Sequence, residues 1–303
     1  MDRELFYNHL IDNIVRSTGK CLDILNALKH ILDRTTLERV YQSFVRSKLE
    51  YASIVWDNCT NEQRNQLEQV QYRAGKIVSG AINRTSKDLV YQELGWHRLE
   101  KRRHVQRLKV FHKMCCGKAP TYLQNEIPVA NPTRDNLRNN NDIPKIRGLV
   151  LYQNTFIPKT ICNWNELNNE TKEIESEETF ARKITRDVDK PIWFTRGDRK
   201  SNIWHARLRM KCSKLNDDLY AYIHVVESPT CSCGARRETS KHFLLDCPLY
   251  VNDRETMLSE LRDIGFKPTT KNLLFGNSCY SDDINCHAVD IIQRFLKATK
   301  RFE

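Results

Sequence analysis

Hydrophobic residues recur at intervals of three and four through residues 1–118, which predicts a bundle of amphipathic helices. Two capping-box patterns, at 35–38 and 60–63, predict where two of these helices begin. Ser86 is predicted to cap a short helix that ends near Gly95. A longer helix is predicted over residues 99–116, before a glycine and a proline.

Residues 119–190 differ in character and are predicted to form a loop-rich connector. Its prolines and a run of asparagines lie among polar residues, at Pro120, Pro128, Pro132, Pro144 and Asn139, Asn140 and Asn141. The stretch 149–167 favours one or two short strands or an extended segment, and a helical pattern returns from Ser176. We therefore expect short extended segments and one helix here.

Residues 191–303 predict further helices around one short strand. A helix is expected over 201–222, a strand at 223–226 (IHVV), and a last helix over about 282–302. The fold class expected is mainly α, with a helical bundle at 1–118, the connector at 119–190, and a C-terminal helical module at 191–303.

The net charge of the chain indicates which class of partner it binds. The 303 residues include 49 Lys and Arg against 38 Asp and Glu, a formal net charge of +11. A surplus of this size favours a polyanion, either nucleic acid or an anionic membrane surface. No apolar stretch is long enough to span a membrane, and the N-terminal residues lack the apolar core of a secretory signal. The eleven cysteines then fit reduced thiols, so we expect a nuclear or cytoplasmic protein that is not secreted.

One tight group of cysteine and histidine lies near the C-terminus. Cys231, Cys233, His242 and Cys247 follow a C-x-C-x8-H-x4-C spacing. Zinc prefers four tetrahedral ligands from thiolate and imidazole, and a turn at Gly234 would bring the first two sulfurs together. Because all four positions are filled, none remains for a catalytic water. We predict one structural Zn²⁺.

The alternative is that these four residues are unrelated and that the thiols are buried as small hydrophobic groups. Four ligands within 17 residues favour zinc. Elsewhere, Cys279 and Cys286 lie near His287, but this trio lacks a nearby fourth ligand. We interpret it as helix packing.

Two basic segments are candidates for binding a polyanion. In the first, Arg98, Arg102, Lys109 and Lys113 are spaced so that they share one helix face. The alternative for that face is a solvated helix surface.

The second basic segment, residues 193–214, carries seven cations and one acid, Asp198. Its cations are Arg196, Arg199, Lys200, Arg207, Arg209, Lys211 and Lys214, with Trp193, Phe194 and Trp204 among them. Cations that neutralise phosphates and rings that stack on bases commonly hold a single strand. The alternative is that the tryptophans belong to the core. The adjacent zinc module favours RNA or DNA as the partner.

The sequence YSDD at 280–283 spells an aromatic-x-Asp-Asp box, a metal-binding signature of reverse transcriptases. Such a box needs a strand hairpin and a further carboxylate to hold two Mg²⁺ ions, and no alternating strand pattern surrounds it. A helix cap at Ser281 or Asp282 is the favoured interpretation. The chain also lacks G-x-S-x-G, P-loop and G-x-G-x-x-G motifs, so we expect no catalytic residues and no small-molecule substrate.

Several blocks resemble, in order, the C-terminal part of jockey-like non-LTR (LINE-type) retrotransposon polyproteins. They are LDRTTLERVYQSFVRSKLEYASIVWDNCT, LEQVQYRAGKIVSGA, ELGWHRLEKRRHVQRLKVFHKM, HARLRMKCSKLN, SPTCSCG and ETSKHFLLDCPLY. The resemblance covers nearly the whole chain. In that family the region follows the reverse-transcriptase palm and comprises a helical thumb and a segment with a CCHC zinc motif.

The resemblance implies a thumb-like domain at 1–118 and assigns the CCHC motif to Cys231, Cys233, His242 and Cys247. It also implies that the thumb-like helices and the zinc module bind the RNA or DNA of a mobile element. The family's polymerase and endonuclease residues lie upstream of the matched region, so its RNA-directed DNA polymerase activity is not expected here. The alternatives are a non-enzymatic protein-interaction module derived from a retroelement, or a fragment without function.

Overall fold

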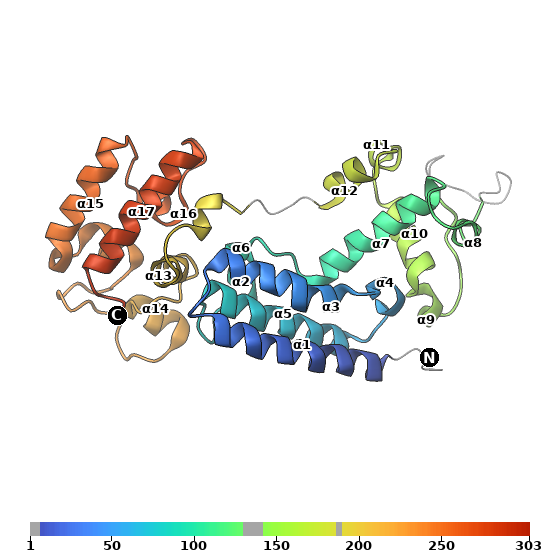
Figure 1. The fold of residues 1–303 in the computed structure, drawn as a ribbon, viewed down its shortest axis with the longest axis horizontal. Coiled ribbons are helices and arrows are strands. Elements are labelled where there is room, and N and C mark those ends of the chain that lie inside the picture. Colours follow the sequence, from blue (N-terminus) through green and yellow to red (C-terminus); the bar gives the residue numbers. More distant parts are fainter. Residues whose placement is uncertain (1–6, 130–141, 186–189) are drawn as a thin grey trace. The chain divides into compact units, whose positions relative to one another are not determined.

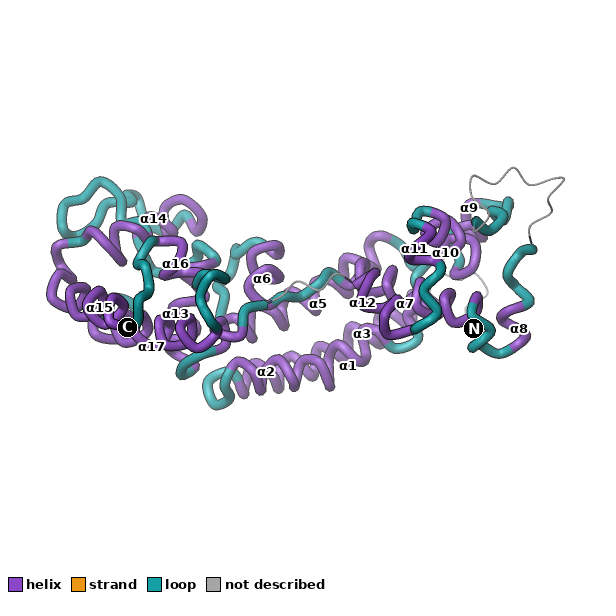
Figure 2. Tube along the Cα trace, turned by 90° about the horizontal axis from the view of Figure 1, so that it is seen from above, coloured by secondary structure: helices purple, strands orange, loops and turns teal. Residues whose placement is uncertain are grey.

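A computed structural model describes residues 7–129, 142–185 and 190–303 of the chain. All regular elements in these ranges are helical, and Figure 2 shows them joined by loops without a strand. The predicted mainly α class is confirmed. The α-helices are α1 (Asn8–Leu28), α2 (Arg34–Val40), α3 (Ser47–Glu50), α4 (Ser53–Trp56), α5 (Asn61–Ser79), α6 (Lys87–Leu94), α7 (Leu99–Cys115), α8 (Thr121–Gln124), α9 (Val150–Gln153), α10 (Phe156–Asn165), α11 (Asn169–Lys172), α12 (Glu177–Thr185), α13 (Arg199–Arg209), α14 (Asn216–Asp218), α15 (Val251–Asp263), α16 (Thr270–Phe275) and α17 (Asp282–Ala298).

Five helical turns that are not α-helical complete the elements in the described ranges. Three are π-helical, η1 (Tyr41–Arg46), η3 (Leu219–Ile223) and η4 (His242–Asp246), and two are 3₁₀ turns, η2 (Ile192–Thr195) and η5 (Pro248–Tyr250). In the described part of the chain, no helix is long and apolar enough to cross a bilayer.

Several helix ends lie where capping residues predicted them. The Ser86 hydroxyl accepts the Leu89 N–H at 3.3 Å, and α6 ends at Gly95 with φ of +66°. At the start of α5, the Thr60 N–H donates to the Gln63 side chain at 2.8 Å, and the Gln63 N–H donates back to the Thr60 hydroxyl at 3.3 Å. This is the reciprocal pattern of a capping box.

Three local expectations were wrong. Residues 223–226 form no strand, because Ile223 ends η3 and His224 takes a left-handed conformation with φ of +57°. The predicted helix over 201–222 is broken after α13, since Lys211 also has a positive φ, of +52°. The N-cap of α2 is Asp33 rather than Thr35, because the Asp33 carboxylate accepts the Thr36 N–H at 3.0 Å.

The connector is more helical than expected. Residues 149–167 contain α9 and α10 in place of strands. Ile157, Ile161 and Trp164 recur at helical intervals, and Pro158 lies in the first turn, where proline is tolerated. Pro132 and the asparagines at 139–141 lie outside the described residues.

Contacts divide the chain into two compact units, each built from three segments. Unit 1 takes residues 1–19, 46–70 and 97–188, and unit 2 takes 20–45, 71–96 and 189–303. The linear division at 118 and 190 stays a prediction, and the contacts group segments that are distant in sequence.

The core of unit 1 joins α7, α10 and α12. Phe111 of α7 meets Trp164 of α10 edge to face, with ring centroids 5.4 Å apart, and Phe180 of α12 is fully buried beside them. The buried Asp57 accepts hydrogen bonds from Arg103 of α7 and from two further cations. The basic helix α7 is therefore held on one side by apolar packing and on another by a carboxylate.

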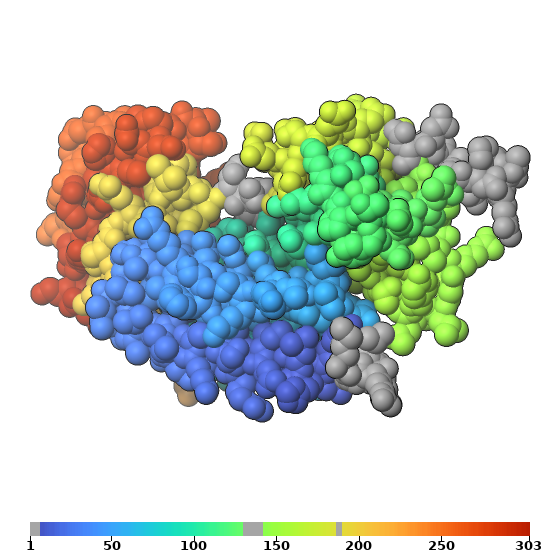
Figure 3. Space-filling view, turned by 45° about the vertical axis from the view of Figure 1, so that its right-hand side comes forward, coloured from blue at the N-terminus to red at the C-terminus, as the bar shows by residue number. Residues whose placement is uncertain are grey.

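The main core of unit 2 is formed by α13, α15, α16 and α17. α15 and α17 lie side by side, and α13 and α16 both pack on α17 (Figure 1). In Figure 3 the orange and red residues of this unit lie against the yellow residues around α13. Phe243, Phe295 and Phe302 pack together, with centroids 5.2 to 5.4 Å from Phe243.

A buried ionic cluster lies in the same unit. The Glu93 carboxylate accepts from Arg34 at 2.6 Å and from Arg209 at 2.7 and 2.8 Å. Arg34 also pairs with Glu38 at 3.2 Å, and Glu38 pairs with Lys190 at 2.8 Å. Burial alone would raise the pKa of Glu93, but Arg209 and Arg34 lower it overall. We name these five residues the Glu93 cluster.

Candidate metal centre and basic surfaces

A tight turn positions the first two cysteines of the CCHC group. The Gly234 N–H donates to the Cys231 carbonyl at 2.9 Å, and the Cys231 N–H donates to the Ala235 carbonyl at 2.9 Å. Gly234 has φ of +94°, a conformation that favours glycine, although a Cβ there would meet nothing within 4 Å. The requirement for glycine is therefore one of backbone conformation. Cys233 therefore lies within a turn that both hydrogen bonds close, near Cys231.

The other two residues of the group come from one short helical turn. His242 begins η4, and its N–H donates to the Thr239 hydroxyl at 3.1 Å. The Cys247 N–H closes the turn on the His242 carbonyl at 2.7 Å, and η5 then starts at Pro248. His242 and Cys247 are thus joined by a single hydrogen-bonded turn.

The four side chains converge on one point. Their ligand atoms all lie within 4.8 Å of one another, with Cys231 Sγ 3.8 Å from Cys247 Sγ and Cys233 Sγ 3.2 Å from His242 Nε2. Disulfide sulfurs lie about 2.05 Å apart, so Cys231 and Cys247 do not form a disulfide. In a tetrahedron with metal–sulfur bonds of about 2.3 Å, two sulfurs lie about 3.8 Å apart. This group could hold a metal ion, and we name it the Cys/His centre.

The thiols respond differently to their surroundings. Burial raises the pKa of Cys231 to about 12 and also raises that of Cys247. A hydrogen bond from the Ala235 backbone N–H lowers the pKa of Cys233. Because three neighbouring sulfurs repel one another when ionised, a bound cation that displaces their protons favours the thiolate forms.

The centre is attached to the core by side chains that the sequence did not single out. Glu238, which is 2% exposed, accepts two hydrogen bonds of 2.7 Å from Arg301, beyond the end of α17. Its carboxylate also accepts the Asn216 N–H at 2.8 Å. Arg254 of α15 donates to the carbonyls of Leu244, at 3.1 Å, and Cys247. Nothing in their spacing marks Glu238 and Arg301 beforehand, because these two partners are distant in sequence.

The first basic segment lies on α7 in unit 1. Arg98 is the residue before α7, and Arg102 pairs with Glu50. Lys113 pairs with Glu177 at 2.9 Å. Arg102 and Lys109 line a cleft of about 340 Å³, together with Lys101, Arg103 and His97. The structure thus brings two of the four predicted residues to one cleft, and acids offset part of their charge.

The second basic segment is split between core and surface in unit 2. Trp204 is 6% exposed and belongs to the main core, and Arg209 belongs to the Glu93 cluster. Trp193 and Phe194 are also buried. Stacking of bases on these rings is therefore not available, and neither Trp204 nor Arg209 forms part of a binding surface. The alternative stated for these rings, a place in the core, is what the structure shows.

The remaining cations of this segment have varied partners. Arg196 pairs with Asp290 at 2.9 Å, and Lys200 lies 3.3 Å from Glu303 and 5.0 Å from the Trp204 ring. The others bond to or lie near main-chain carbonyls and rings: Arg199 to carbonyls of residues 29, 77 and 78, Arg207 to that of Gly80, Lys214 to those of Phe302 and Glu303, and Lys211 5.7 Å from the Tyr222 ring.

The YSDD sequence begins α17. The Ser281 hydroxyl accepts the Ile284 N–H at 3.3 Å, and Asp282 and Asp283 lie exposed in the first helical turn. The predicted helix cap is confirmed. Acids in this position interact favourably with the helix dipole.

No family model, curated protein or solved structure matches this chain.

Proposed function

We propose that this chain is a zinc-containing module that binds nucleic acid, equivalent to the thumb and CCHC segment at the end of a jockey-like non-LTR reverse transcriptase. The observation that carries the proposal is the Cys/His centre, in which four ligand atoms lie within 4.8 Å. The blocks of sequence resemblance surround this centre and give its context.

The donor set favours zinc over other common ions. Three sulfurs and one imidazole nitrogen suit a borderline-soft cation, whereas Mg²⁺ and Ca²⁺ require oxygen ligands. The 3.8 Å separation of Cys231 Sγ and Cys247 Sγ agrees with an edge of a zinc tetrahedron. With four protein ligands, the role of the ion is structural.

Nucleic acid is the partner that the charge supports. The net charge is +11, and cations gather in clefts of both units. In unit 1, Lys101, Arg102 and Lys109 line one cleft that also contains Glu50. Since Trp204 is buried, the proposed binding relies on phosphate contacts rather than on stacking, which predicts a strong dependence on salt.

The proposed role does not include catalysis. Asp282 and Asp283, the only acids in a polymerase-like sequence pattern, occupy the first turn of α17, where they face solvent. The carboxylates that hold Mg²⁺ in the resembled family precede the region matched here. In the proposed arrangement, the polymerase of that family catalyses nucleotide addition, and this segment binds the nucleic acid.

A salt titration of binding to a labelled single-stranded RNA and to a DNA duplex tests the proposal. We expect the logarithm of the binding constant to fall linearly with the logarithm of salt concentration, with a slope of about −0.7 per phosphate contact for the single strand. Absence of measurable affinity for both at physiological salt would contradict nucleic-acid binding and favour a protein-interaction module. Template-dependent nucleotide incorporation that Asp282→Ala abolishes would contradict the non-catalytic role.

A further inference from the structure

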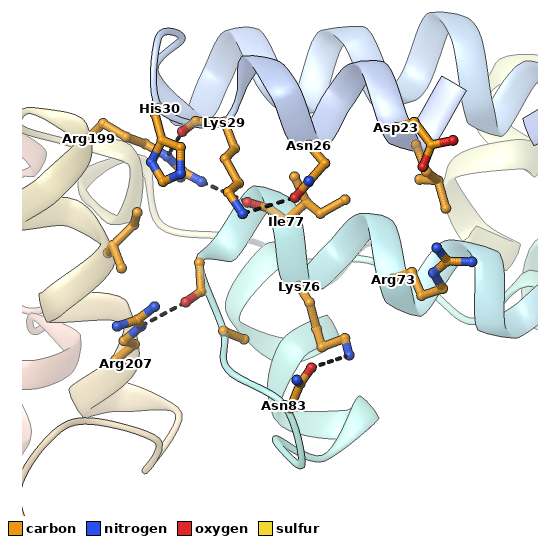
Figure 4. A pocket seen from close by; sticks show the side chains of 14 residues that line it. Asp23, Asn26, Lys29, His30, Arg73, Lys76, Ile77, Asn83, Arg199 and Arg207 are labelled. Atoms are coloured by element: carbon orange, nitrogen blue, oxygen red, sulfur yellow. Dashed lines mark hydrogen bonds between the residues drawn. The ribbon is translucent and has the colours of Figure 1, made fainter. Parts of the chain in front are cut away.

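A second cleft, of about 400 Å³, lies within unit 2 and is lined by three segments. Lys29 and His30 follow the end of α1, Arg73 and Lys76 lie on α5, and Arg207 lies on α13. Figure 4 shows these side chains arranged around a shared opening, with Asp23 and Arg73 at one end. Its volume lies within the range of about 300–1,000 Å³ that is typical of ligand pockets.

The charge of this cleft is strongly one-sided. Its lining contains five Lys or Arg side chains and His30, but a single carboxylate, Asp23, so about four positive charges remain when His30 is neutral. Among the residues that the structure describes, none of these five cations forms an ion pair with a carboxylate. This contrasts with the cleft of unit 1, where Glu50 pairs with Arg102.

Part of this charge has a structural role. Arg199 donates through Nε, Nη1 and Nη2 to the carbonyls of Lys29, Val78 and Ile77, at 3.1, 2.5 and 2.7 Å. These carbonyls belong to the C-terminal ends of α1 and α5, which favour a cation. Arg199 therefore holds the wall of the cleft, and a ligand would be bound by the other cations.

The other cations retain N–H groups that could donate hydrogen bonds to a ligand. Arg207 uses Nε for the Gly80 carbonyl at 2.7 Å, which leaves both terminal nitrogens. Lys29 contacts the neutral amide of Asn26 at 3.0 Å. Lys76 contacts that of Asn83 at 3.3 Å and lies 4.9 Å from the centroid of the Tyr72 ring. Such contacts supply hydrogen bonds without neutralising the ammonium groups.

The concentration of positive charge is unfavourable without an anion. Burial, reinforced by the charges of Arg34 and Arg207, lowers the pKa of Arg199 to about 10, while Asp33 and Glu38 act weakly in the opposite direction. Arg199 remains charged at neutral pH, so its repulsion by neighbouring cations persists. An anion in the cleft would relieve this repulsion and satisfy the free donors.

We propose that this cleft binds adjacent phosphate groups, and that Lys29, Arg73, Lys76 and Arg207 are the residues that contact them. The spacing of cations on three segments suits a multiply charged ligand better than a single carboxylate. Where the chain binds nucleic acid as proposed above, on which this step rests, the ligand is the phosphodiester backbone of a strand. A free polyphosphate offers the same chemistry, and the experiment separates the two sources.

The test compares the wild-type chain with the double variant Lys29→Gln and Lys76→Gln. Lys29 contacts a side-chain amide, and Lys76 contacts a side-chain amide and the face of the Tyr72 ring. Because neither lysine is in an ion pair, their replacement should leave the fold intact. Binding of a labelled uridine oligonucleotide and of inorganic tripolyphosphate is measured between about 50 and 200 mM salt. We expect about tenfold weaker oligonucleotide binding at 100 mM salt and a salt slope smaller by about 1.4, because two phosphate contacts are lost.

A matched control carries Lys267→Gln and Lys271→Gln, two exposed lysines of the same unit outside the cleft lining. It has the same net charge as the test variant, so a general electrostatic effect would weaken both equally. Equal affinity and slope for the two variants would overturn the proposal while leaving nucleic-acid binding intact. A third outcome is that none of the three proteins binds the oligonucleotide, while the test variant alone loses tripolyphosphate binding. This outcome would support a phosphate site and contradict the proposed function.

Discussion

The Cys/His centre and the Glu93 cluster are two polar groups of unit 2 whose charges are compensated differently. In the Glu93 cluster, Glu93 and Glu38 pair with Arg34, Arg209 and Lys190 of the same unit, and the ion pairs are 2.6 to 3.2 Å long. In the Cys/His centre, three sulfurs and an imidazole face one another with no cationic side chain among them.

The difference indicates which group depends on something outside the chain. The Glu93 cluster is complete when the chain folds, because each charge has a partner. The Cys/His centre has four ligands directed at one point, and thiolates so close together require a cation. Removal of metal and removal of Glu93 should therefore damage different parts of the same unit.

The largest expected effect is that of Cys231→Ser or His242→Ala. Each removes one of four ligands, and zinc sites of this kind contribute about 10–16 kcal/mol of binding energy in small peptides. We expect loss of stoichiometric metal and rapid amide exchange across residues 228–250, with slow exchange retained in α6 and α13. Hydrogen exchange and metal analysis measure both.

The matched control for the ligand variants is Cys279→Ser, which changes an exposed cysteine of the same unit. It should keep its metal and its exchange pattern. Retention of metal by both ligand variants, or loss of protection throughout unit 2, would contradict a local metal site and remove the contrast with the Glu93 cluster.

The second effect is that of Glu93→Gln. The amide keeps the shape of the carboxylate but leaves Arg209 buried without a counter-charge, and leaves Arg34 with Glu38 as its remaining carboxylate partner. Breaking a buried ion pair from one side costs about 3–5 kcal/mol. Denaturant unfolding should show a loss of this size with metal content unchanged.

The exposed substitution Glu255→Gln serves as control, and surface changes of this kind alter stability by about 0.5 kcal/mol or less. A Glu93→Gln variant as stable as this control would mean that the cluster does not support the unit.

A smaller effect concerns pH. His205 is buried, its Nε2 lies 2.8 Å from the Leu273 carbonyl, and burial together with the Arg209 charge lowers its pKa to about 3. The folded pKa lies below the unfolded value of about 6.5, so this contribution is complete above pH 6.5 and is lost as pH falls towards 3. Between pH 6.5 and 5 the loss amounts to about 2 kcal/mol.

Comparison with His205→Gln isolates this term, because glutamine can donate to the Leu273 carbonyl but does not titrate. Unfolding is measured at pH 7 and pH 5 for both proteins, and acid-induced metal release is common to them. The variant should lose about 2 kcal/mol less than the wild type. Equal losses would show that the cluster tolerates a further positive charge beside Arg209.

The Cys/His centre could be predicted because its ligands are close in sequence. All four lie within one turn and one short helix, so their spacing alone indicates the geometry. The basic cleft could not, since Lys29, Lys76 and Arg207 come from three separate segments. The same holds for Glu238 and Arg301, whose contact depends on how α17 packs.

Helix ends were predicted best where a side-chain cap was present, as at Ser86 and Ser281. The strand at 223–226 was predicted wrongly because so short an apolar run fits both a strand and the end of a helix. In addition, nothing in the sequence indicates the positive φ of His224, which is not a glycine. In 193–214 the pattern of cations and rings was the same for a binding surface and for a core edge. Only the burial of Trp204 and Arg209 separates them.

The most direct test of the account is the metal content of the purified full chain, measured by elemental analysis after removal of loosely bound ions. The account predicts one zinc per chain, released by a strong chelator together with loss of amide protection at residues 228–250. A chain without stoichiometric zinc, with the same protection before and after chelation, would contradict it.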